Sequence, residues 1–427
     1  MIVILLVLGL LALFLLRVPV AFALLAVSLA YILFLSPLPP TVGVQRMVSG
    51  VDSFVLIALP LFILGGNLMN SGGLTQRMLN ATLAYVGRVK GGLAQTNIGV
   101  SLVMGGVSGS AVADASALGS MLIPAMRKGG YTAPFSSALT ASSAVIGPLI
   151  PPSIPMIVIA TTAGLGVGEM FLAGAVPGIV LALGLSVATM LLARKYEWPL
   201  EAKANLRAIF KRTAVAVPAL VAPAIIVGGI LSGVFTPTEA ASILCVYALV
   251  VGVVIYRNLG IREMFRAGLA SAMDASGILI IMAAAAAFGY VLTIENVPQL
   301  IATALEPLYA VPWLFLLLIN ILLLLLGMFM EALAVIILLT PILMPAVLAA
   351  GIDPVHFATL VVVNLMIGVI TPPLGVVMFI TNRIAGVTVG DFLRANTPYF
   401  VVFGIVLLLV TYVPLMTTWL PGLLAGP

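Results

Sequence analysis

Apolar runs of the length that a bilayer crossing requires recur along this chain from its first residues to its last. A transmembrane helix needs roughly 17 to 25 mostly apolar residues. Of the 427 residues, 63% are hydrophobic and only 7% are charged, whereas soluble chains carry roughly 25% charge. Such a chain cannot bury its apolar surface in a water-soluble core. The sequence therefore predicts an all-α polytopic membrane protein that leaves no soluble domain over.

Ten of these runs predict single crossings, and two longer ones predict helical hairpins. The crossings are expected at residues 2–16, 18–35, 54–69, 132–166, 170–193, 213–231, 240–256, 276–292, 355–380 and 399–420. The runs 93–126 and 313–348 are each long enough to enter and return, and both are interrupted by Gly, Ser, Glu or Pro. We expect both to be re-entrant hairpins.

The basic residues favour one orientation of these crossings. With the N-terminus outside, seventeen of the eighteen lysines and arginines fall on the inner side, and only Arg46 falls outside. This asymmetry is the one that the positive-inside rule describes. Loop position also explains the net charge of +5, so the charge does not indicate binding of nucleic acid, which needs basic and aromatic residues clustered on a solvated face.

A polar stretch divides the chain into halves. Residues 194–212 carry six basic and two acidic residues, and we interpret them as a surface helix on the inner face that connects two membrane repeats. The predicted organisation is a first repeat at 1–193 with a leading helix and the first hairpin, the basic connector at 194–212, and a second repeat at 213–427 with the second hairpin.

The two halves match when the second is moved back by 221 positions. The matched glycines and prolines include Gly106 with Gly327, Pro124 with Pro345, Gly130 with Gly351, Gly147 with Gly368, and Pro151 and Pro152 with Pro372 and Pro373. Chance rarely matches runs of Gly and Pro. The expected topology gives the two copies opposite orientations, which predicts an inverted repeat, the architecture of secondary carriers with broken helices.

The first hairpin carries a Gly-Gly-Val-Ser-Gly-Ser-Ala run at residues 105–111, followed by Asp114 and Ser116. Glycine permits a non-helical tip, and non-helical backbone at membrane depth is tolerated where it is buried in protein or lines a cavity. Its free carbonyls and the serine hydroxyls are hard oxygen ligands suited to a small cation such as sodium. The alternative is tight helix packing through small residues.

The next helix carries Ser142 and Ser143 before three prolines at 148, 151 and 152. Prolines lack an amide donor and favour an unwound stretch, so we predict a discontinuous helix, with a simple proline kink as the alternative. The second half has the matching pair, with Glu331 at its hairpin and Asn364, Gly368 and Thr371 before its own prolines. Two discontinuous helices thus face two hairpins.

Asp114 and Glu331 are the only acids that these assignments place at membrane depth, where ionisable groups by default suggest function. Either acid could instead cap a helix or bond to backbone amides. Single Cys245 and single His356 argue against redox and zinc chemistry, so no cofactor is expected. His356 is interpreted as structural, Arg383 as a boundary arginine and residues 236–239 as a capping turn.

The runs 105–120, 146–155, 236–241 and 368–373 together resemble the large membrane subunit of tripartite ATP-independent periplasmic (TRAP) transporters, over nearly the whole chain. The resemblance implies a sodium-driven importer of small organic anions such as dicarboxylates or sugar acids, with an elevator-type movement of the hairpin unit. It also implies a bacterial or archaeal cytoplasmic membrane, a small partner subunit of about four membrane helices, and a periplasmic substrate-binding protein.

Carried over to this sequence, the resemblance gives two sodium sites with sodium as the coupling ion. The residues expected to bind substrate or ions are Ser108, Gly109, Ser110, Asp114, Ser142, Ser143, Gly147, Pro151, Glu331, Asn364, Gly368, Thr371 and Pro372. Those expected at sodium are Ser110, Ser143, Gly147, Asn364, Gly368 and Thr371. Substrate is expected between the two hairpin tips.

Three other functions remain as alternatives. A carrier that acts without partner proteins would share all of these features. A channel would need a continuous pore with polar rings, whereas the polar groups here cluster at two related breaks. A membrane-embedded enzyme would need a positioned nucleophile, base or metal set, which one cysteine and one histidine do not supply.

Overall fold

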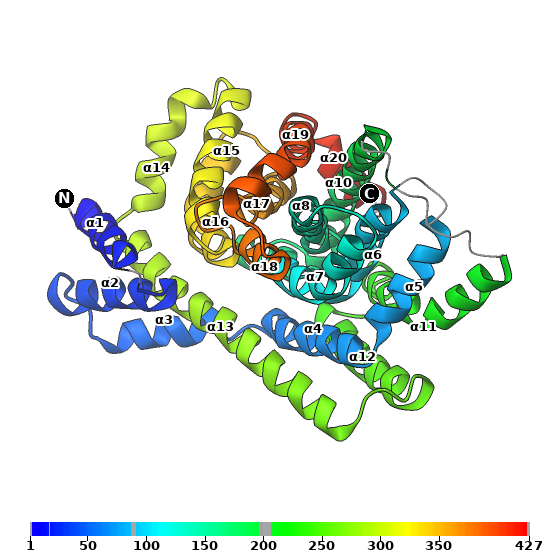
Figure 1. Cartoon of the computed structure of the whole chain (residues 1–427). Helices are drawn as coiled ribbons and strands as arrows, with labels where there is room; N and C mark the ends of the chain where they lie inside the picture. The colour runs from blue at the N-terminus through cyan, green and yellow to red at the C-terminus, as the bar shows by residue number, and fades with distance from the viewer. Residues whose placement is uncertain (1, 17, 87–90, 196–197, 199–205, 425–427) are drawn as a thin grey trace.

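Every regular element in the computed structural model is a helix across the residues that it describes, which are 2–16, 18–86, 91–195, 198 and 206–424 (Figure 1). Eight of these helices are long and apolar enough to cross a membrane, or nine if one bent pair counts as a single span. The prediction of an all-α, multi-pass membrane protein is confirmed.

The helices of the first half follow one another with short connections. They are α1 (Ile2–Leu15), α2 (Val20–Phe34), α3 (Thr41–Val51), α4 (Phe54–Ser71), α5 (Leu74–Val86), α6 (Gly92–Ser108), α7 (Ala111–Lys128), α8 (Ala133–Ala144), η1 (Gly147–Leu149), α9 (Ile154–Ala163) and α10 (Val167–Lys195). The pair α6 and α7 occupies the first predicted hairpin, with Gly109 and Ser110 between the two helices.

The second half repeats this order of helices. It contains α11 (Leu206–Leu231), α12 (Pro237–Val250), η2 (Val251–Ile255), α13 (Ile261–Ile294), α14 (Val297–Leu305), η3 (Glu306–Leu308), α15 (Pro312–Phe329), α16 (Ala332–Ala349), α17 (Pro354–Gly368), α18 (Val376–Ala385), α19 (Val389–Tyr412) and α20 (Leu415–Leu424). A shift of 221 residues places α7 on α16 at both ends and the start of α8 on the start of α17. The helix bounds therefore follow the register read from the glycines and prolines.

One difference between the two halves lies in the helices that precede the hairpins. In the first half α3 and α4 are separate helices, interrupted at Asp52 and Ser53. The same shift places both of them on α13, a single helix of 34 residues. The first repeat therefore has an interruption, called here the joint between α3 and α4, where the second repeat has one continuous helix.

The helix is interrupted at both proline pairs. The segment that ends with α8 and η1 is bent by 43° against α9, and seven residues separate α17 from α18. Pro148, Pro151 and Pro152 cannot donate backbone hydrogen bonds, and each proline disfavours helical backbone at the residue before it. The predicted discontinuity of the helices 132–166 and 355–380 is confirmed.

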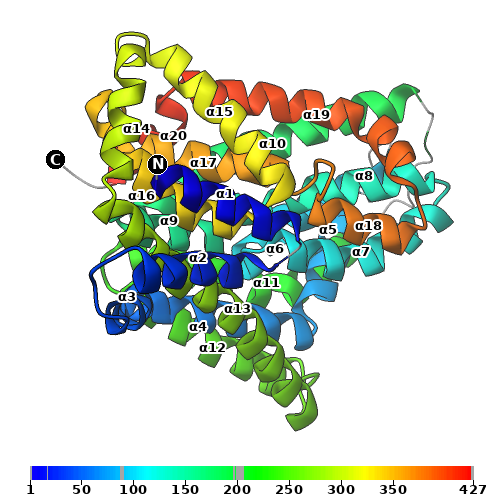
Figure 2. The ribbon, with the colours of Figure 1, turned by 90° about the vertical axis from the view of Figure 1, so that its left-hand side faces the viewer.

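The helices form two groups that both ribbon views separate. In Figure 1, α2, α3, α4, α12 and α13 lie along the lower side, while α6 to α8 and α16 to α18 fill the middle; Figure 2 shows α9 near α16 and α17, above α3, α4, α12 and α13. Within the lower group, α13 packs against α2, α3 and α4, and α4 packs against α12. The first and second halves thus contribute to both groups.

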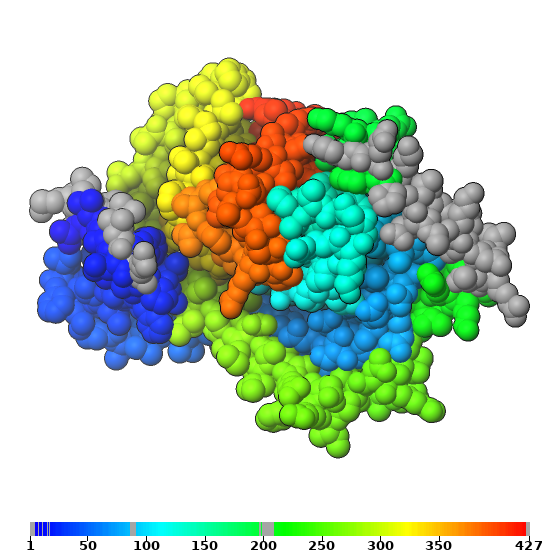
Figure 3. All heavy atoms as spheres, viewed as in Figure 1, coloured from blue at the N-terminus to red at the C-terminus, as the bar shows by residue number. Residues whose placement is uncertain are grey.

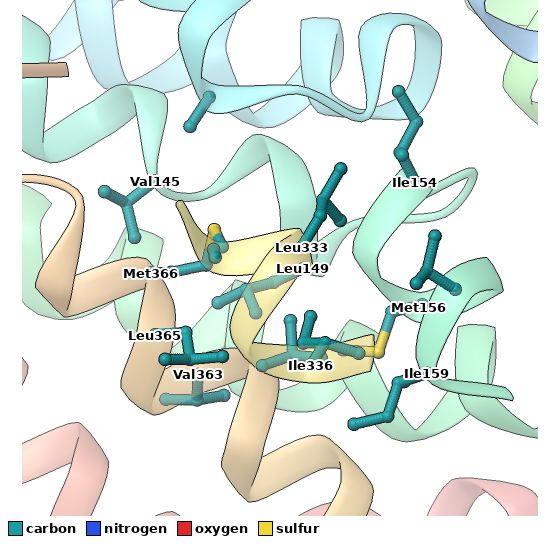
Figure 4. Packing of buried hydrophobic residues seen from close by; sticks show 14 of the residues in the cluster. Val145, Leu149, Ile154, Met156, Ile159, Leu333, Ile336, Val363, Leu365 and Met366 are labelled. Atoms are coloured by element: carbon teal, nitrogen blue, oxygen red, sulfur yellow. The ribbon is translucent and has the colours of Figure 1, made fainter. Parts of the chain in front are cut away.

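The two halves also pack directly against each other in the middle group. Figure 3 shows the orange surface of α17 and α18 beside the cyan surface of α7 and α8, and α18 contacts both α7 and α8. Close by, α16 packs against α9 and α17. Figure 4 shows side chains from the first broken helix, including Leu149 and Met156, gathered with Leu333, Ile336 and Met366 of the second half. One apolar core therefore joins the two breaks.

Several sequence assignments need correction. The crossing assigned to 399–420 is two helices, because α19 starts at Val389 and ends at Tyr412 and α20 follows. The crossing assigned to 276–292 is the second half of α13, which begins at Ile261. The sequence analysis missed α3, α5 and α14 as helices.

The described parts of the predicted connector at 194–212 belong mostly to the long helices on either side of it. Residues 194 and 195 belong to the end of α10, and residues 206–212 are the first turns of α11. Trp198 is in no regular element, and residues 196–197 and 199–205 of that connector lie outside the described residues.

Candidate functional site

A cavity of about 380 Å³ lies between the tip of the first hairpin and the lower helix group. Its walls come from α4, the tip joining α6 to α7, α13, and the first turn of α16. Residues of both breaks also reach it, among them Pro148 and Val369. The polar side chains that line it are Asn67, Asn70, Ser108, Ser110, Asp114, Ser116, Asp274 and Glu331.

Glycine and serine shape the tip of the first hairpin as the sequence predicts. Gly109 has φ +58°, a left-handed conformation, and an added Cβ would lie 2.5 Å from the Pro152 carbonyl oxygen. The tip also meets the first break through the Ile154 amide, which donates to the Gly109 carbonyl at 3.4 Å. Ser110 then caps α7, accepting from the Ala113 amide at 3.4 Å. Only glycine fits at position 109.

Asp114 lies behind this tip and is 1% exposed. Its Oδ1 accepts a hydrogen bond from the Ser108 hydroxyl at 2.6 Å. Its Oδ2 has no partner among the described residues and lies 2.4 Å from the place where a Cβ on Gly147 would be. Glycine at 147 therefore makes room for a carboxylate whose second oxygen is buried and uncommitted.

The second hairpin turns at Met330 and Glu331, between α15 and α16. Glu331 caps α16, since its carboxylate accepts from the Ala334 amide at 3.2 Å. Ser110 occupies the matching place in the first repeat and does the same for α7. Glu331 is thus both a helix cap, one of the two interpretations that the sequence left open, and a residue of the cavity wall.

Glycines bring each hairpin into backbone contact with its broken helix. A Cβ on Gly105 would lie 2.8 Å from Cα of Gly147, and a Cβ on Gly368 would lie 2.7 Å from the carbonyl carbon and oxygen of Gly327. Real Cβ contacts are not found at such separations. The two repeats therefore share a glycine-on-glycine contact between the first hairpin helix and the break.

Ser143 and Asn364, which the repeat aligns, also contact their hairpins. The Ser143 hydroxyl lies 2.9 Å from Oδ1 of Asn97 in α6, and Nδ2 of Asn364 lies 2.7 Å from Oδ1 of Asn320 in α15. Both side chains are fully buried. Asn364 keeps its Oδ1 without a partner among the described residues.

The predicted residues thus fall into two sets. Those that line the cavity are Ser108, Gly109, Ser110, Asp114 and Glu331. Those that do not line it but lie in or beside the breaks are Ser142, Ser143, Gly147, Pro151, Asn364, Gly368, Thr371 and Pro372. Ser142 points elsewhere, because its hydroxyl donates to Oδ1 of Asn396 in α19 at 2.7 Å. Thr371, in the break after α17, donates to the Ile367 carbonyl in the last turn of that helix at 2.7 Å.

The sequence analysis missed a polar wall opposite the first hairpin. Asp274 lines the cavity from α13, so Asp114 and Glu331 are not the only acids there. Asn67 and Asn70 line it from α4, and Asn67 donates to the Ser271 hydroxyl at 2.9 Å. Asp274 was missed because the crossing was placed two residues beyond it; extending that helix toward the N-terminus would have included it.

Three minor interpretations compare well with the structure. His356 is 2% exposed, and its Nδ1 lies 2.9 Å from the Thr417 hydroxyl, as expected of a structural histidine. Thr236 and Glu239 form the expected capping box at the start of α12. Arg383 is exposed in the last turn of α18.

These oxygens suit a small hard cation. Asp114 Oδ2 and Asn364 Oδ1 are buried acceptors without a protein donor. Leaving such a group unpaired is costly, and carboxylate and carbonyl oxygens are the ligands that hard cations prefer. Each uncommitted oxygen lies where a hairpin meets a break. Each break thus has one uncommitted oxygen of the kind that a hard cation such as sodium accepts as a ligand.

Comparison with known proteins gives the family. The family model described as the DctM component of tripartite ATP-independent periplasmic transporters matches residues 7–416. The chain belongs to the DctM family. It is therefore the large permease of a TRAP transporter, as the resemblance of its motifs indicated.

Curated DctM relatives cover nearly the whole chain. The large permease of a Vibrio cholerae sialic acid TRAP transporter is 39% identical over 96% of each chain. The large permease of an Escherichia coli 2,3-diketo-L-gulonate TRAP transporter is 35% identical over 93% of each chain. A C4-dicarboxylate large permease of Pseudomonas aeruginosa is 38% identical over 87% of each.

A solved structure gives the likeness of fold for this DctM chain. The YdaH transporter of Alcanivorax borkumensis superposes with a TM-score of 0.64, covering 95% of this chain and 98% of that one, at 17% sequence identity. The arrangement of helices is therefore shared with a transporter of very different sequence.

Proposed function

We propose that this DctM chain is the translocating subunit of a sodium-coupled importer of small organic anions in a bacterial or archaeal cytoplasmic membrane. The observation that carries the proposal is the pair of buried, unpaired acceptor oxygens, one at each break, on Asp114 and Asn364. Bound sodium would supply positive charge at both places. The carboxylate and sugar-acid names of the relatives support the substrate class.

The charge of the cavity supports coupling to a cation. Asp114, Asp274 and Glu331 line it, and none of the described residues that line it is a lysine or arginine. An anion entering alone would be repelled, since charges interact strongly where solvent is limited. Cations held near the carboxylates offset this repulsion. Uptake of an anion is therefore expected to depend on sodium being present.

In the proposed movement, the hairpins and broken helices slide as one unit past the lower helix group. The cavity lies between the tip of the first hairpin and α4 and α13, so such a slide would carry the bound anion from one side to the other. A re-entrant, inverted arrangement of the two hairpins fits this movement. Substrate would meet backbone amides, hydroxyls and the Asn67 and Asn70 amides.

Two partner proteins complete the proposal. A periplasmic binding protein would deliver substrate, and a small four-helix membrane subunit would brace the lower group. The isethionate TRAP transporter permease DctMQ fits such a pairing by its name, since the match covers 97% of this chain but only 66% of that longer protein. Uptake into proteoliposomes should require sodium, both partners and this chain; sodium-dependent uptake by this chain alone would favour a stand-alone carrier instead.

We expect alanine at Ser143 or Asn364 to raise the sodium concentration for half-maximal uptake about fivefold or more. Each substitution removes an acceptor oxygen from a break, and a hydrogen bond or ligand of this kind contributes on the order of 1 kcal/mol. Sodium titrations of uptake by the reconstituted complex measure this effect. Unchanged sodium dependence in both variants would contradict the placement, and Ser136→Ala serves as the matched control because Ser136, also in α8, donates to the Thr132 carbonyl of its own segment at 2.9 Å.

We expect Asp274→Asn to lower the substrate concentration for half-maximal uptake about twofold to fivefold. Asp274 has no hydrogen-bond or ion-pair partner in the described part of the chain, so its charge acts on the cavity by repelling anions. Uptake assays with graded substrate measure the change. Asp391→Asn is the control, because Asp391 is bonded to Thr388 at the start of α19. Weaker apparent affinity would mean that Asp274 accepts a hydrogen bond from the substrate.

A further inference from the structure

Each break contains one side chain that is hydrogen-bonded to an asparagine of the facing hairpin. In the second repeat, Nδ2 of Asn364 donates to both the backbone carbonyl and Oδ1 of Asn320, at 3.0 and 2.7 Å. Asn320 is itself held, since its Nδ2 donates to the Leu316 carbonyl at 3.0 Å and to the Thr411 hydroxyl at 2.9 Å. The amide orientations of both asparagines are therefore determined.

This bonding decides which atom of Asn364 is left over. A carboxamide has one NH₂ group and one oxygen, and Asn320 presents two acceptors to it. A flip of the Asn364 amide would set its oxygen against those two acceptors, which is unfavourable. The oxygen must point away from Asn320, and there it has no partner among the described residues although Asn364 is fully buried.

The first repeat has the same bonding with different residues. Thr140 accepts from Nδ2 of Asn97 at 2.7 Å, and Oδ1 of Asn97 lies 2.9 Å from the Ser143 hydroxyl, which has one hydrogen to donate. When that hydrogen goes to Asn97, the lone pairs of Ser143 are left free. Thr140 and Thr411 each donate in turn to their own helix, at 2.8 and 2.6 Å. The order threonine, asparagine, break residue thus occurs twice.

The repeat alignment does not explain why this bonding pattern occurs twice, because the two asparagines are not aligned. Ser143 and Asn364 are 221 residues apart, but Asn97 and Asn320 are not, and the threonines come from α8 and α19. Unrelated positions thus satisfy the donors of the two aligned break residues in the same way. Asn364 keeps a buried oxygen without a partner among the described residues. The Ser143 hydroxyl has its one hydrogen directed at Asn97, with the Thr140 carbonyl 3.2 Å away as a second acceptor, and keeps only its lone pairs to accept.

We infer that Asn97 and Asn320 are positioning residues, which use up the donors of Ser143 and Asn364 and thereby turn their acceptor oxygens toward a bound cation. The inference rests on the proposed sodium coupling and adds to it two residues outside the predicted set. Asn97 and Asn320 themselves do not contact the ion; they act through the side chains that they hold.

The test is sodium binding by the purified chain, measured as the rise in its thermal unfolding temperature with sodium chloride, at constant ionic strength held with choline chloride. Asn320→Leu removes the shorter, side-chain acceptor at 2.7 Å and leaves only the backbone carbonyl facing Asn364, and it should raise the half-maximal sodium concentration about fivefold or more. Asn320→Asp keeps an acceptor facing Asn364 and should stay within about twofold of the natural chain. Thr411→Val removes the hydroxyl that holds Asn320 and leaves the contact between Asn320 and Asn364. It should therefore raise the half-maximal sodium concentration by a smaller factor.

Asn396→Leu is the matched control, because Asn396 is also fully buried and bonded to a break residue, Ser142, in the same bundle. It should lower the unfolding temperature without sodium but leave the half-maximal sodium concentration unchanged. If Asn320→Leu and Thr411→Val behave like this control while the natural chain responds to sodium, the positioning role is refuted and the proposed function stands. A natural chain without any sodium response would overturn the sodium sites and this inference together.

Discussion

Replacing Gly368 by alanine is expected to abolish sodium-dependent uptake and to lower the unfolding temperature. The added methyl group would lie 2.7 Å from the carbonyl carbon and oxygen of Gly327 and 2.8 Å from its Cα. These are backbone atoms of α15, so no rotamer change relieves the contact. Overpacking of this kind destabilises by about 1–3 kcal/mol, and here it would move the hairpin away from the break at which the second sodium site is proposed.

The control for Gly368→Ala is Gly404→Ala in α19. A Cβ on Gly404 meets nothing within 4 Å, so alanine there should leave uptake unchanged and should stabilise the helix by up to about 1 kcal/mol. Uptake in proteoliposomes and thermal unfolding in detergent measure the two effects. Near-normal uptake by Gly368→Ala would show that close backbone contact at the second break is not needed for transport.

Asp114→Asn is expected to reduce sodium-dependent uptake about a hundredfold while making the sodium-free chain more stable. A buried carboxylate with one unpaired oxygen destabilises the folded chain when no cation is bound, and the neutral amide removes that charge. The same change puts an NH₂ group or a neutral oxygen where the charged oxygen faced the cation. Loss of one partner of a buried charge pair costs about 3–5 kcal/mol.

The opposite signs of these two effects distinguish Asp114 from a structural residue. Substitution of a purely structural carboxylate would lower both the unfolding temperature of the chain and its sodium-dependent uptake. Asp353→Asn is the control, since Asp353 caps α17 through the His356 amide at 2.9 Å and asparagine caps equally well. Lower stability of Asp114→Asn in sodium-free buffer would contradict the proposed role.

The sequence predicted the hairpins and breaks because their signals are local. Glycine at 109 and the prolines at 151, 152, 372 and 373 act on the backbone where they stand, whatever surrounds them. The helices α6, α7, α15 and α16 therefore begin and end within a few residues of the predicted hairpin bounds. The repeat supported each predicted break a second time, because the two breaks match at a shift of 221 residues.

The partners of the site residues could not be predicted in this way. Asn97 lies 46 residues from Ser143 and on another helix, and no spacing along the chain links them. Asp274 was left out of the predicted crossing 276–292 for a different reason. Arg262, Glu263 and Arg266 lower the hydropathy at the start of α13, so the apolar run was taken to begin after Asp274. The short helices α3, α5 and α14 were missed because none of them is an apolar run of crossing length.

The joint between α3 and α4, which has no counterpart in α13, makes the two copies mechanically unequal. In a carrier with inverted repeats, the outward-open and inward-open forms differ by an exchange of conformation between the two repeats. Identical repeats would therefore give the two forms equal free energy. In the proposed movement, an interrupted helix beside one hairpin and a continuous helix beside the other would remove that equality, so one form would be more populated at rest. Which form is favoured would then depend on whether the helix is continuous at residues 52 and 53.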